Sequence, residues 1–296
     1  MALITTSGTV YKPKLVKDLF NKVRGHSTLA KLSASEPVPF SGIDVMTFSI
    51  DGEASIVGEG QKKPAGDADV KPTTIKPVKF IYQHRVTDEF LKMSAEKQLP
   101  ILNSFNSGFA KKIARGFDIA AFHGVNPSTN EDSEIVGNNC FDKLVTNVIT
   151  YDSAAPDDNI DAAASVILTS DGVISGIAMS SEFGAALGAM KTADSHVTIY
   201  PEFRFGANPG SFGGINTDVN GTVSFGSSPD RAIVGDFADA FRWGYAQNMT
   251  FEIIPYGDPD GQGDLKQHNQ IVLRGECYVG WGILDKDSFA RIATGG

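Results

Sequence analysis

The most regular hydrophobic pattern in the chain lies between residues 97 and 122. Its apolar positions recur at steps of three and four: Leu102, Phe105, Phe109, Ile113, Phe117 and Ala120. Polar and charged residues fill the opposite positions, so the pattern predicts a helix with one buried face. Pro100 is expected in its first turn, and Gly124 is expected to end it. At a rise of ~1.5 Å per residue the helix would be about 40 Å long, which suits a structural strut.

Two glycines interrupt this predicted helix. Gly108 and Gly116 each weaken a helix by about 1 kcal/mol relative to alanine. We therefore expect either that another segment packs closely against these positions or that the helix bends there.

A second pattern predicts a long β-hairpin. Residues 43–50, 54–57 and 75–86 have strand character, and the glycine-rich stretch 58–66 is expected to form the tip. Charged residues dominate the hairpin, and few bulky apolar residues separate them. Because an isolated two-stranded ribbon is only marginally stable in water, we expect this one to lie on another subunit.

The N-terminal region predicts a short amphipathic helix that begins at Pro13. Its surroundings are basic, with Lys12, Lys14, Lys17, Lys22 and Arg24. Two interpretations stay open: a solvated helix face, or an arm that lies on an acidic neighbour or on nucleic acid.

The remaining patterns predict an α+β domain of about a hundred residues. Helices are expected at 158–168 and 181–190, and strands at 173–179, 197–200, 222–225, 231–234 and 250–254. A last strand is expected at 270–278. Thr87 is expected to cap a short helix that ends at Met93.

Composition narrows the possible functions. The chain has 296 residues, 41% of them hydrophobic, and a formal net charge of −9. This size and composition predict a soluble protein with a sizeable core, and the charge argues against a general nucleic-acid binder. Cys140 and Cys277 are too few for a disulfide framework, and no signal peptide is visible, which favours the cytoplasm. No apolar run reaches the ~20 residues of a membrane span.

Motifs for catalysis or cofactor binding are not found. The histidines lie far apart without metal-ligand spacing, so each is expected to be structural: His26, His84, His123, His196 and His268. Residues 258–264 alternate aspartates with glycines, which could hold Ca²⁺, but a plain turn is favoured because the later glutamate of a calcium loop is missing. We predict no metal, no cofactor and no enzyme activity.

Several motifs together resemble one protein family. They are VGEGQKKP at 57–64, VTDEFL at 86–91, DIAAFHG at 118–124, GDFADAFRWG at 235–244, NQIVLRGE at 269–276 and DSFA at 287–290. Their order and spacing, with the basic arm and the long hairpin, resemble the major capsid proteins of tailed bacteriophages with the HK97 fold. The resemblance covers nearly the whole chain.

This resemblance implies an α+β, HK97-like capsid fold with four parts. They are an N-terminal arm at 1–38, an extended hairpin called the E-loop at 39–80, a peripheral domain at 81–146 and 256–296, and an axial domain at 147–255. The peripheral domain would include the spine helix, 97–123. The E-loop residues expected between subunits are Glu59, Lys62, Lys63, Asp67 and Asp69.

The same resemblance implies a structural function. Hexamers and pentamers of the chain would form an icosahedral shell around double-stranded DNA, without sequence-specific DNA binding. The protein would be found in the virion after assembly in the bacterial cytoplasm. Expected partners are a portal, a separate scaffold and decoration proteins. Because no long helical extension for a fused scaffold precedes the arm, either a separate scaffold assists assembly or the shell forms without one.

One covalent reaction is also implied by the resemblance. Some family members join subunits by an isopeptide bond, and the matching residues here are Lys63, Asn269 and Glu276. The carboxylate would deprotonate the lysine, which attacks the amide carbon and releases ammonia. The same residues also fit an exposed loop lysine and an ordinary strand edge.

Two other functional classes stay open at this stage. An encapsulin-type nanocompartment shares the fold, and an α+β enzyme is disfavoured because no catalytic constellation is found. Particle size separates these classes, because a shell measures hundreds of ångströms whereas an enzyme would be a monomer or a small oligomer.

Overall fold

A long helix organises the fold, as the hydrophobic pattern predicts. In the computed structural model, which describes residues 26–51, 56–63 and 67–295, this helix is α4, Ala95–His123. Gly124 ends it in the left-handed conformation, with φ of 71°, which glycine adopts without strain. Because α4 begins at Ala95, Pro100 lies in the second turn, and the prediction of a first-turn proline is wrong.

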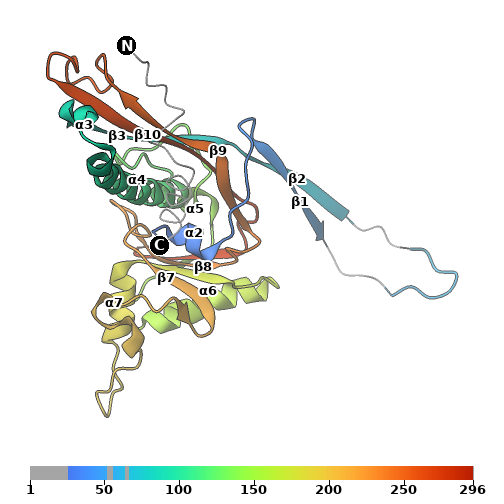
Figure 1. Ribbon diagram of the computed structural model, residues 1–296. Coiled ribbons are helices and arrows are strands. Elements are labelled where there is room, and N and C mark those ends of the chain that lie inside the picture. Colours follow the sequence, from blue (N-terminus) through green and yellow to red (C-terminus); the bar gives the residue numbers. More distant parts are fainter. Residues whose placement is uncertain (1–25, 52–55, 64–66, 296) are drawn as a thin grey trace.

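A three-stranded antiparallel sheet packs against α4 (Figure 1). Its order is β3, β10, β9, with bounds Pro77–Thr87, Gln270–Ile283 and Phe241–Ile254. The predicted strands at 270–278 and 250–254 are parts of these longer strands. Gly275 of β10 lets the helix approach closely, because a Cβ there would lie 2.8 Å from the Phe109 ring. The rings of Phe117, Trp243 and Trp281 fill the centre of this core.

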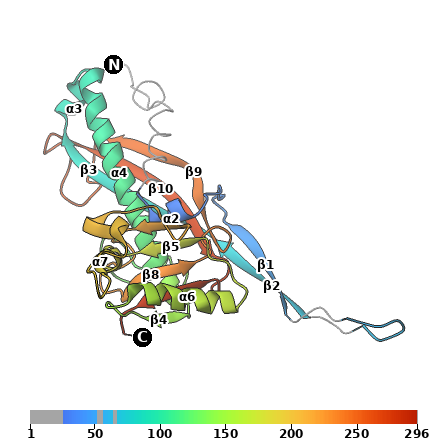
Figure 2. The ribbon, with the colours of Figure 1, turned by 90° about the horizontal axis from the view of Figure 1, so that it is seen from below.

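A second, six-stranded sheet forms the other half of the body (Figure 2). Its order is β4 (Val148–Thr150), β11 (Phe289–Ala293), β8 (Asp230–Gly235), β5 (Gly176–Met179), β7 (Ile215–Val219) and β6 (Ser211–Phe212). Helices α6, Pro156–Thr169, and α7, Ser181–Ala189, supply apolar residues to its core, as predicted at these positions. The predicted strand at 231–234 is confirmed as β8.

Three local predictions are wrong. Residues 197–200 form only an isolated bridge, Lys191 with Thr198, before the 3₁₀ helix η1, Pro201–Gly206. Residues 222–225 lie in a turn and not in a strand, and the Thr222 hydroxyl donates a hydrogen bond to the buried Asp118. The short helix α3, Glu89–Lys92, has Asp88 rather than Thr87 at its N-cap position.

The predicted hairpin is present, with a different returning strand. β1, Ile43–Asp51, pairs with β2, Asp67–Ile75, so the returning strand ends where 75–86 was expected to begin. After a one-residue break at Lys76 the chain runs on into β3 (Figure 1). Of the predicted strand 54–57, residues 54–55 lie outside the described residues, and Ile56 and Val57 have no strand structure.

Two short segments fasten the N-terminal side to the body. Helix α2, Thr28–Leu32, lies between the sheets, and residues 35–38 run along β9, where Glu36 N–H donates to Trp243 O at 2.9 Å. The remaining short helix, α5, Phe141–Leu144, packs against α4. The predicted N-terminal helix lies outside the described residues. Among the helices that the structure describes, none combines the length and apolar character needed to cross a bilayer.

Candidate assembly interface

The hairpin formed by β1 and β2 stands away from the body (Figures 1 and 2). Its strands pair only with each other in the described residues. Met46 is 64% exposed, and Ile56 near the tip is fully exposed. Only the base is well packed, because Ile75 is buried against Gly280 and Gly282 of β10. The hairpin therefore presents apolar side chains that the described part of the chain leaves exposed.

The residues predicted to lie between subunits belong to this hairpin. Glu59, Lys62 and Lys63 are exposed at the tip. Asp67 and Asp69 stand opposite Asp51 and Ser49 in the ladder of β1 and β2. The predicted basic arm residues lie outside the described residues: Lys12, Lys14, Lys17, Lys22 and Arg24.

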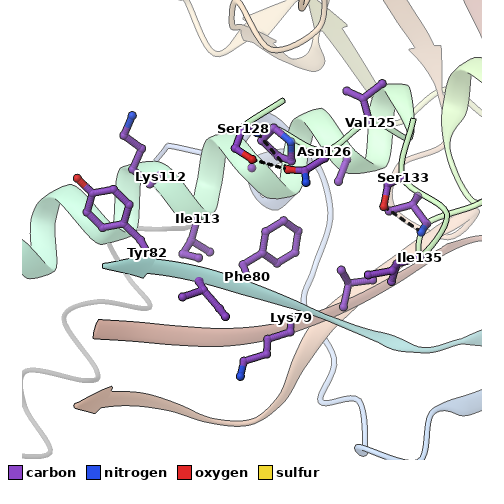
Figure 3. A pocket seen from close by; sticks show the side chains of 16 residues that line it. Lys79, Phe80, Tyr82, Lys112, Ile113, Val125, Asn126, Ser128, Ser133 and Ile135 are labelled. Carbon is purple, nitrogen blue, oxygen red and sulfur yellow. Dashed lines mark hydrogen bonds between the residues drawn. The ribbon is translucent and has the colours of Figure 1, made fainter. Parts of the chain in front are cut away.

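An apolar groove of about 370 Å³ lies between α4, β3 and the loop after α4 (Figure 3). Phe80, Ile113, Gly116 and Lys112 are among the residues that line it. Ile135 at the groove is 80% exposed, which is unusual for a large apolar side chain. The groove, at Ile135, and the hairpin, at Met46 and Ile56, thus both expose apolar side chains, although they lie on different parts of the chain.

The apolar residues of the predicted spine helix face the three-stranded sheet. Leu102, Phe109, Ile113 and Phe117 are buried, and Phe105 is half-buried between Tyr82 and Phe109. Their contacts fix the helix on the sheet and position the groove beside it.

The three residues proposed for cross-linking are not brought together within one chain. Asn269 precedes β10 and lies beside the Thr87 end of β3, whereas the hairpin leaves from the Pro77 end. Lys63 lies beyond that end at the hairpin tip. Glu276 already pairs with Lys79, at 3.0 Å between Nζ and Oε2.

A buried carboxylate joins α4 to α2. Asp118 has no exposed surface, and it accepts hydrogen bonds from Thr28 N at 2.9 Å and Thr222 Oγ1 at 3.1 Å. The Ser27 hydroxyl and Leu29 N donate to its other oxygen. Burial raises the pKa of Asp118 to about 7, against the lowering effect of these donors. Sequence spacing gives no signal for this cluster, because its members come from distant segments.

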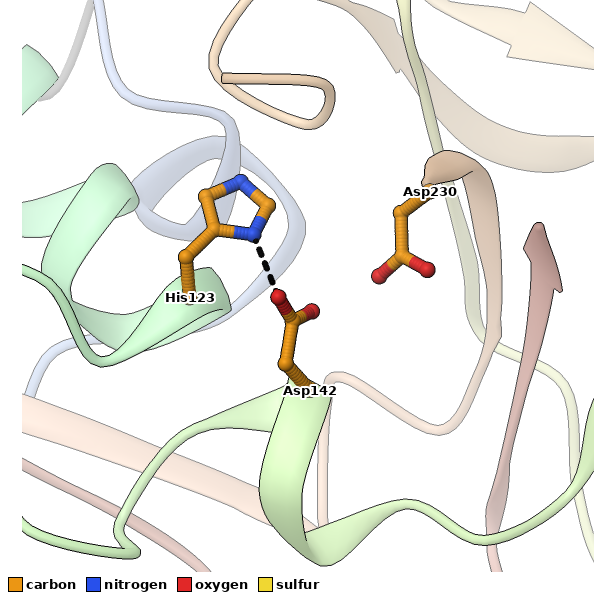
Figure 4. A group of neighbouring side chains, drawn as sticks. All are labelled: His123, Asp142 and Asp230. Carbon is orange, nitrogen blue, oxygen red and sulfur yellow. Dashed lines mark hydrogen bonds and ion pairs between the residues drawn. The ribbon is translucent and has the colours of Figure 1, made fainter. Parts of the chain in front are cut away.

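A second buried network joins α4, α5 and the six-stranded sheet (Figure 4). His123 Nε2 lies 2.9 Å from the carbonyl oxygen of Thr222, so this nitrogen must carry the proton, and Nδ1 faces Asp142 Oδ2 at 2.9 Å. Burial lowers the pKa of His123, but the hydrogen bond and charge of Asp142 outweigh it and raise the pKa overall. Arg291 donates to both oxygens of Asp230.

This network has the donor atoms of a metal site, but its charges are already matched. His123, Asp142 and Asp230 each place a ligand atom within 4.8 Å of the others, a grouping that the scattered histidines did not predict. Arg291 also lies 3.4 Å from Asp142, so a protonated His123 and Arg291 balance the two carboxylates. The guanidinium would repel a cation, and the residues therefore fit an ion-pair network better than a metal centre.

The aspartate turn at 258–264 is likewise occupied by a protein cation. Arg85 of β3 donates to Asp260 and lies 3.2 Å from Asp258. The hydrogen bond from Arg85 lowers the pKa of Asp260 to about 2. This arrangement supports the plain turn over the calcium loop.

Solved structures similar to this chain come from phages and from a GTA particle. A structure titled Mycobacterium phage Ogopogo has a TM-score of 0.78 and 29% identity, and the match covers 91% of this chain and 92% of the other. One titled Gordonia phage Cozz has a TM-score of 0.72 at 24% identity, covering 92% and 87%. The capsid of an empty GTA particle has a TM-score of 0.63 at 14% identity, covering 100% and 94%.

Sequence comparison gives a matching result. No curated protein sequence matches significantly. Residues 8–293 match the model of the phage capsid family. The predicted α+β, HK97-like capsid fold is therefore confirmed, and the chain belongs to the phage capsid family.

Proposed function

We propose that this structural major capsid protein forms a closed icosahedral shell of hexamers and pentamers around double-stranded DNA. The observation that carries the proposal is the projecting hairpin, in which Met46 is 64% exposed and Ile56 fully exposed in the part of the chain that the structure describes. Identical copies around a ring make the same contact repeatedly, so one projecting element per copy can close the ring. The family supports this function over an encapsulin shell or an enzyme.

The hairpin of one copy is proposed to lie on the body of the next. The groove between α4 and β3 offers a surface of matching character, because Ile81 and Ile135 are exposed beside it. Burial of such side chains contributes about 25 cal/mol per Å² of apolar surface removed from water. Assembly would therefore stabilise a hairpin that is marginal on its own.

The predicted parts of the capsid fold become proposed roles for observed elements. The hairpin is assigned to the E-loop (39–80), α4 to the spine helix (97–123), and residues 1–38 to the arm. The peripheral domain, 81–146 and 256–296, contains β3 and β10, whereas β9 of the same sheet comes from the axial range, 147–255. The three-stranded and the six-stranded sheet thus each contain strands from both ranges, which ties the two proposed domains together.

Other components of the particle are part of the same proposal. A portal, a separate scaffold and decoration proteins are the expected partners, and assembly is expected in the cytoplasm of the bacterial host. The net charge of −9 suits a container that holds DNA without binding it tightly.

Electron microscopy of the purified chain tests the shell proposal. We expect negative-stain images to show particles hundreds of ångströms across. Ile56→Asp should abolish particles while leaving the circular dichroism spectrum unchanged, because a charge cannot be buried in an apolar contact. Ile56→Leu keeps the apolar character and should assemble. A compact monomer from the unaltered chain would refute the proposal.

We also propose that copies of the chain are joined by a covalent cross-link. The Lys63 amine would attack the side-chain amide carbon of Asn269 on another copy, forming an amide and releasing ammonia. Asn269 directly precedes β10, and at ~3.3 Å per residue Glu276 lies about 23 Å along the chain from it, so the assisting carboxylate would come from a further copy. Particles should give a ladder of covalent oligomers on denaturing gels. Lys63→Arg should remove the ladder and Lys62→Arg should keep it, whereas monomer alone from unaltered particles would refute cross-linking.

A further inference from the structure

The outward face of α4 carries a stripe of basic residues. Lys97, Ser104, Gly108, Lys111 and Arg115 are separated by seven, four, three and four residues, so they lie on one side of the helix. The lysines and the arginine are exposed, and this side is opposite the buried apolar stripe. We call Lys97, Lys111 and Arg115, with the adjacent exposed Lys112, the basic stripe.

The charges of the basic stripe are not neutralised within the described residues. Its three lysines have no ion-pair partner there, and Glu96 is the only exposed acid of α4. Other cations on the body differ: Lys79 pairs with Glu276, and Lys143 pairs with Asp132. An uncompensated row of positive charges in a chain of net charge −9 marks a surface for an anionic partner.

The lowered pKa of His26 also indicates a positive electrostatic potential beside the basic stripe. Burial lowers the pKa of His26, and the charges of Lys111 and Lys31 lower it further. Lys31 is paired with Asp218, whereas Lys111 keeps its charge uncompensated. The guanidinium of Arg115 stacks 5.2 Å from the centre of the Phe225 ring, which orients it while leaving its N–H groups available.

Small residues between these cations allow a broad partner to come close. Ser104 and Gly108 separate Lys97 from Lys111, which lie about 21 Å apart along the helix axis. A Cβ at Gly108 would meet no atom within 4 Å, so packing inside the described chain does not explain this glycine. Ser104 and Gly108 border a hollow of about 280 Å³ beside Tyr82 and Val86 of β3, so the surface is low between the cations at the two ends of the stripe.

We propose that the basic stripe contacts the phosphates of enclosed double-stranded DNA. The inference rests on the proposed shell function and adds that α4 faces the lumen. Backbone phosphates suit a row of lysines because the contact needs charge and no base recognition. Four cations on one helix give a weak, salt-sensitive contact, and this limits adhesion of the DNA to the wall.

Duplex binding by the whole, unassembled chain tests the proposal. The probe is a fluorescent duplex of mixed sequence, and its anisotropy is measured over a range of salt concentrations. Replacing Lys111, Lys112 and Arg115 together by Gln should weaken binding about tenfold at low salt, and should reduce the slope of log K against log[salt] by about 2 to 3. Circular dichroism checks that the variant is folded.

A matched variant separates the stripe from net charge. Replacing Lys191, Lys266 and Lys286 by Gln removes the same charge from other exposed positions and should change binding less than about twofold. Equal losses in both variants would overturn the proposal. Tighter binding of polyglutamate than of the duplex would also overturn it and would indicate an acidic protein partner instead.

Particles provide a second, independent measurement. Lysine acetylation by a small reagent, read by mass spectrometry, should be slower at Lys111 and Lys112 in DNA-filled particles than in emptied ones, and unchanged at Lys191. Equal labelling in both states would show that the stripe does not face DNA, while the particles themselves would still support the shell function. A chain that binds duplex but forms no particles would instead refute the shell function.

Discussion

The hairpin and the last two turns of α4 differ in how their side chains are covered. From Gly116 to His123 every residue of α4 is buried, and the polar Asp118 and His123 have hydrogen-bond partners in the same chain. The hairpin instead exposes Met46 and Ile56 and pairs with no third strand among the described residues. The fold therefore completes one region internally and leaves the other for contact with further copies.

This difference separates folding from assembly. Substitutions between Gly116 and His123 of α4 should change the free energy of unfolding of the chain. Substitutions in the hairpin should change particle formation alone. The following predictions test that separation, beginning with the largest expected effect on stability.

Removal of the Asp118 carboxylate should have the largest effect. Asp118→Ala leaves Thr28 N and Leu29 N without an acceptor inside the protein, because the carboxylate alone reaches both. We expect a loss of about 3 kcal/mol in the free energy of unfolding. Urea unfolding followed by tryptophan fluorescence measures it, since Trp243 and Trp281 lie in the adjacent core. A loss below about 1 kcal/mol would contradict a structural role for this carboxylate.

The pH dependence of stability should come next in size. The pKa of Asp118 is raised by burial to about 7 in the folded chain, so between about pH 4 and pH 7 the folded state holds a proton that the unfolded state releases. Stability should therefore fall as pH rises through this window. The raised pKa of His123 acts in the same direction, because its contribution is lost as pH rises through the folded value.

Unfolding at about pH 5.5 and about pH 8 measures this dependence. We expect a loss of about 1 to 2 kcal/mol at the higher pH. Asp118→Asn removes one titrating group and should flatten the profile, although its baseline stability is lower. A profile that rises with pH in the unaltered chain would show that Asp118 is ionised in the folded state throughout.

The sequence was sufficient to predict structures with a local cause. The helix α4 follows from its repeated apolar positions and from Gly124, which takes the left-handed conformation that ends a helix. The hairpin follows from its strands and its glycine-rich tip. Exposure of Glu59 and Lys63 at that tip follows from the same pattern.

Other features depend on contacts between distant segments. Thr222 and Asp118 are 104 residues apart in the sequence, so their hydrogen bond could not be predicted from local spacing. A strand was therefore expected where the structure has a turn. His123 meets Asp142 and Asp230 only because the six-stranded sheet lies against the end of α4. The groove beside Ile135 likewise exists only after the loop folds back on the helix. The spacing of residues along the sequence does not predict contacts between such distant segments.

The two glycines of α4 should respond in opposite directions to alanine. A Cβ at Gly116 would lie 3.3 Å from the Phe80 ring and 3.5 Å from Pro127, which explains this glycine by close packing. A Cβ at Gly108 would meet nothing within 4 Å. Gly108→Ala should stabilise the chain by about 0.5 to 1 kcal/mol through helix propensity. In Gly116→Ala, crowding against the Phe80 ring should offset this gain. The free energies of unfolding of the two variants should therefore differ by about 1 to 3 kcal/mol. Equal effects would show that Phe80 moves aside freely.

The smallest effect on stability is expected in the hairpin. Met46 is 64% exposed, so Met46→Ser removes little buried surface and should change the free energy of unfolding by less than about 0.5 kcal/mol. If this side chain packs on a neighbouring copy, the same change should still reduce the yield of particles counted in electron micrographs. A matched change at an exposed apolar residue of α6, Leu168→Ser, tests whether any lost apolar surface has this effect. A clear loss of stability in Met46→Ser would mean that the hairpin packs within its own chain, and the contrast with α4 would then fail.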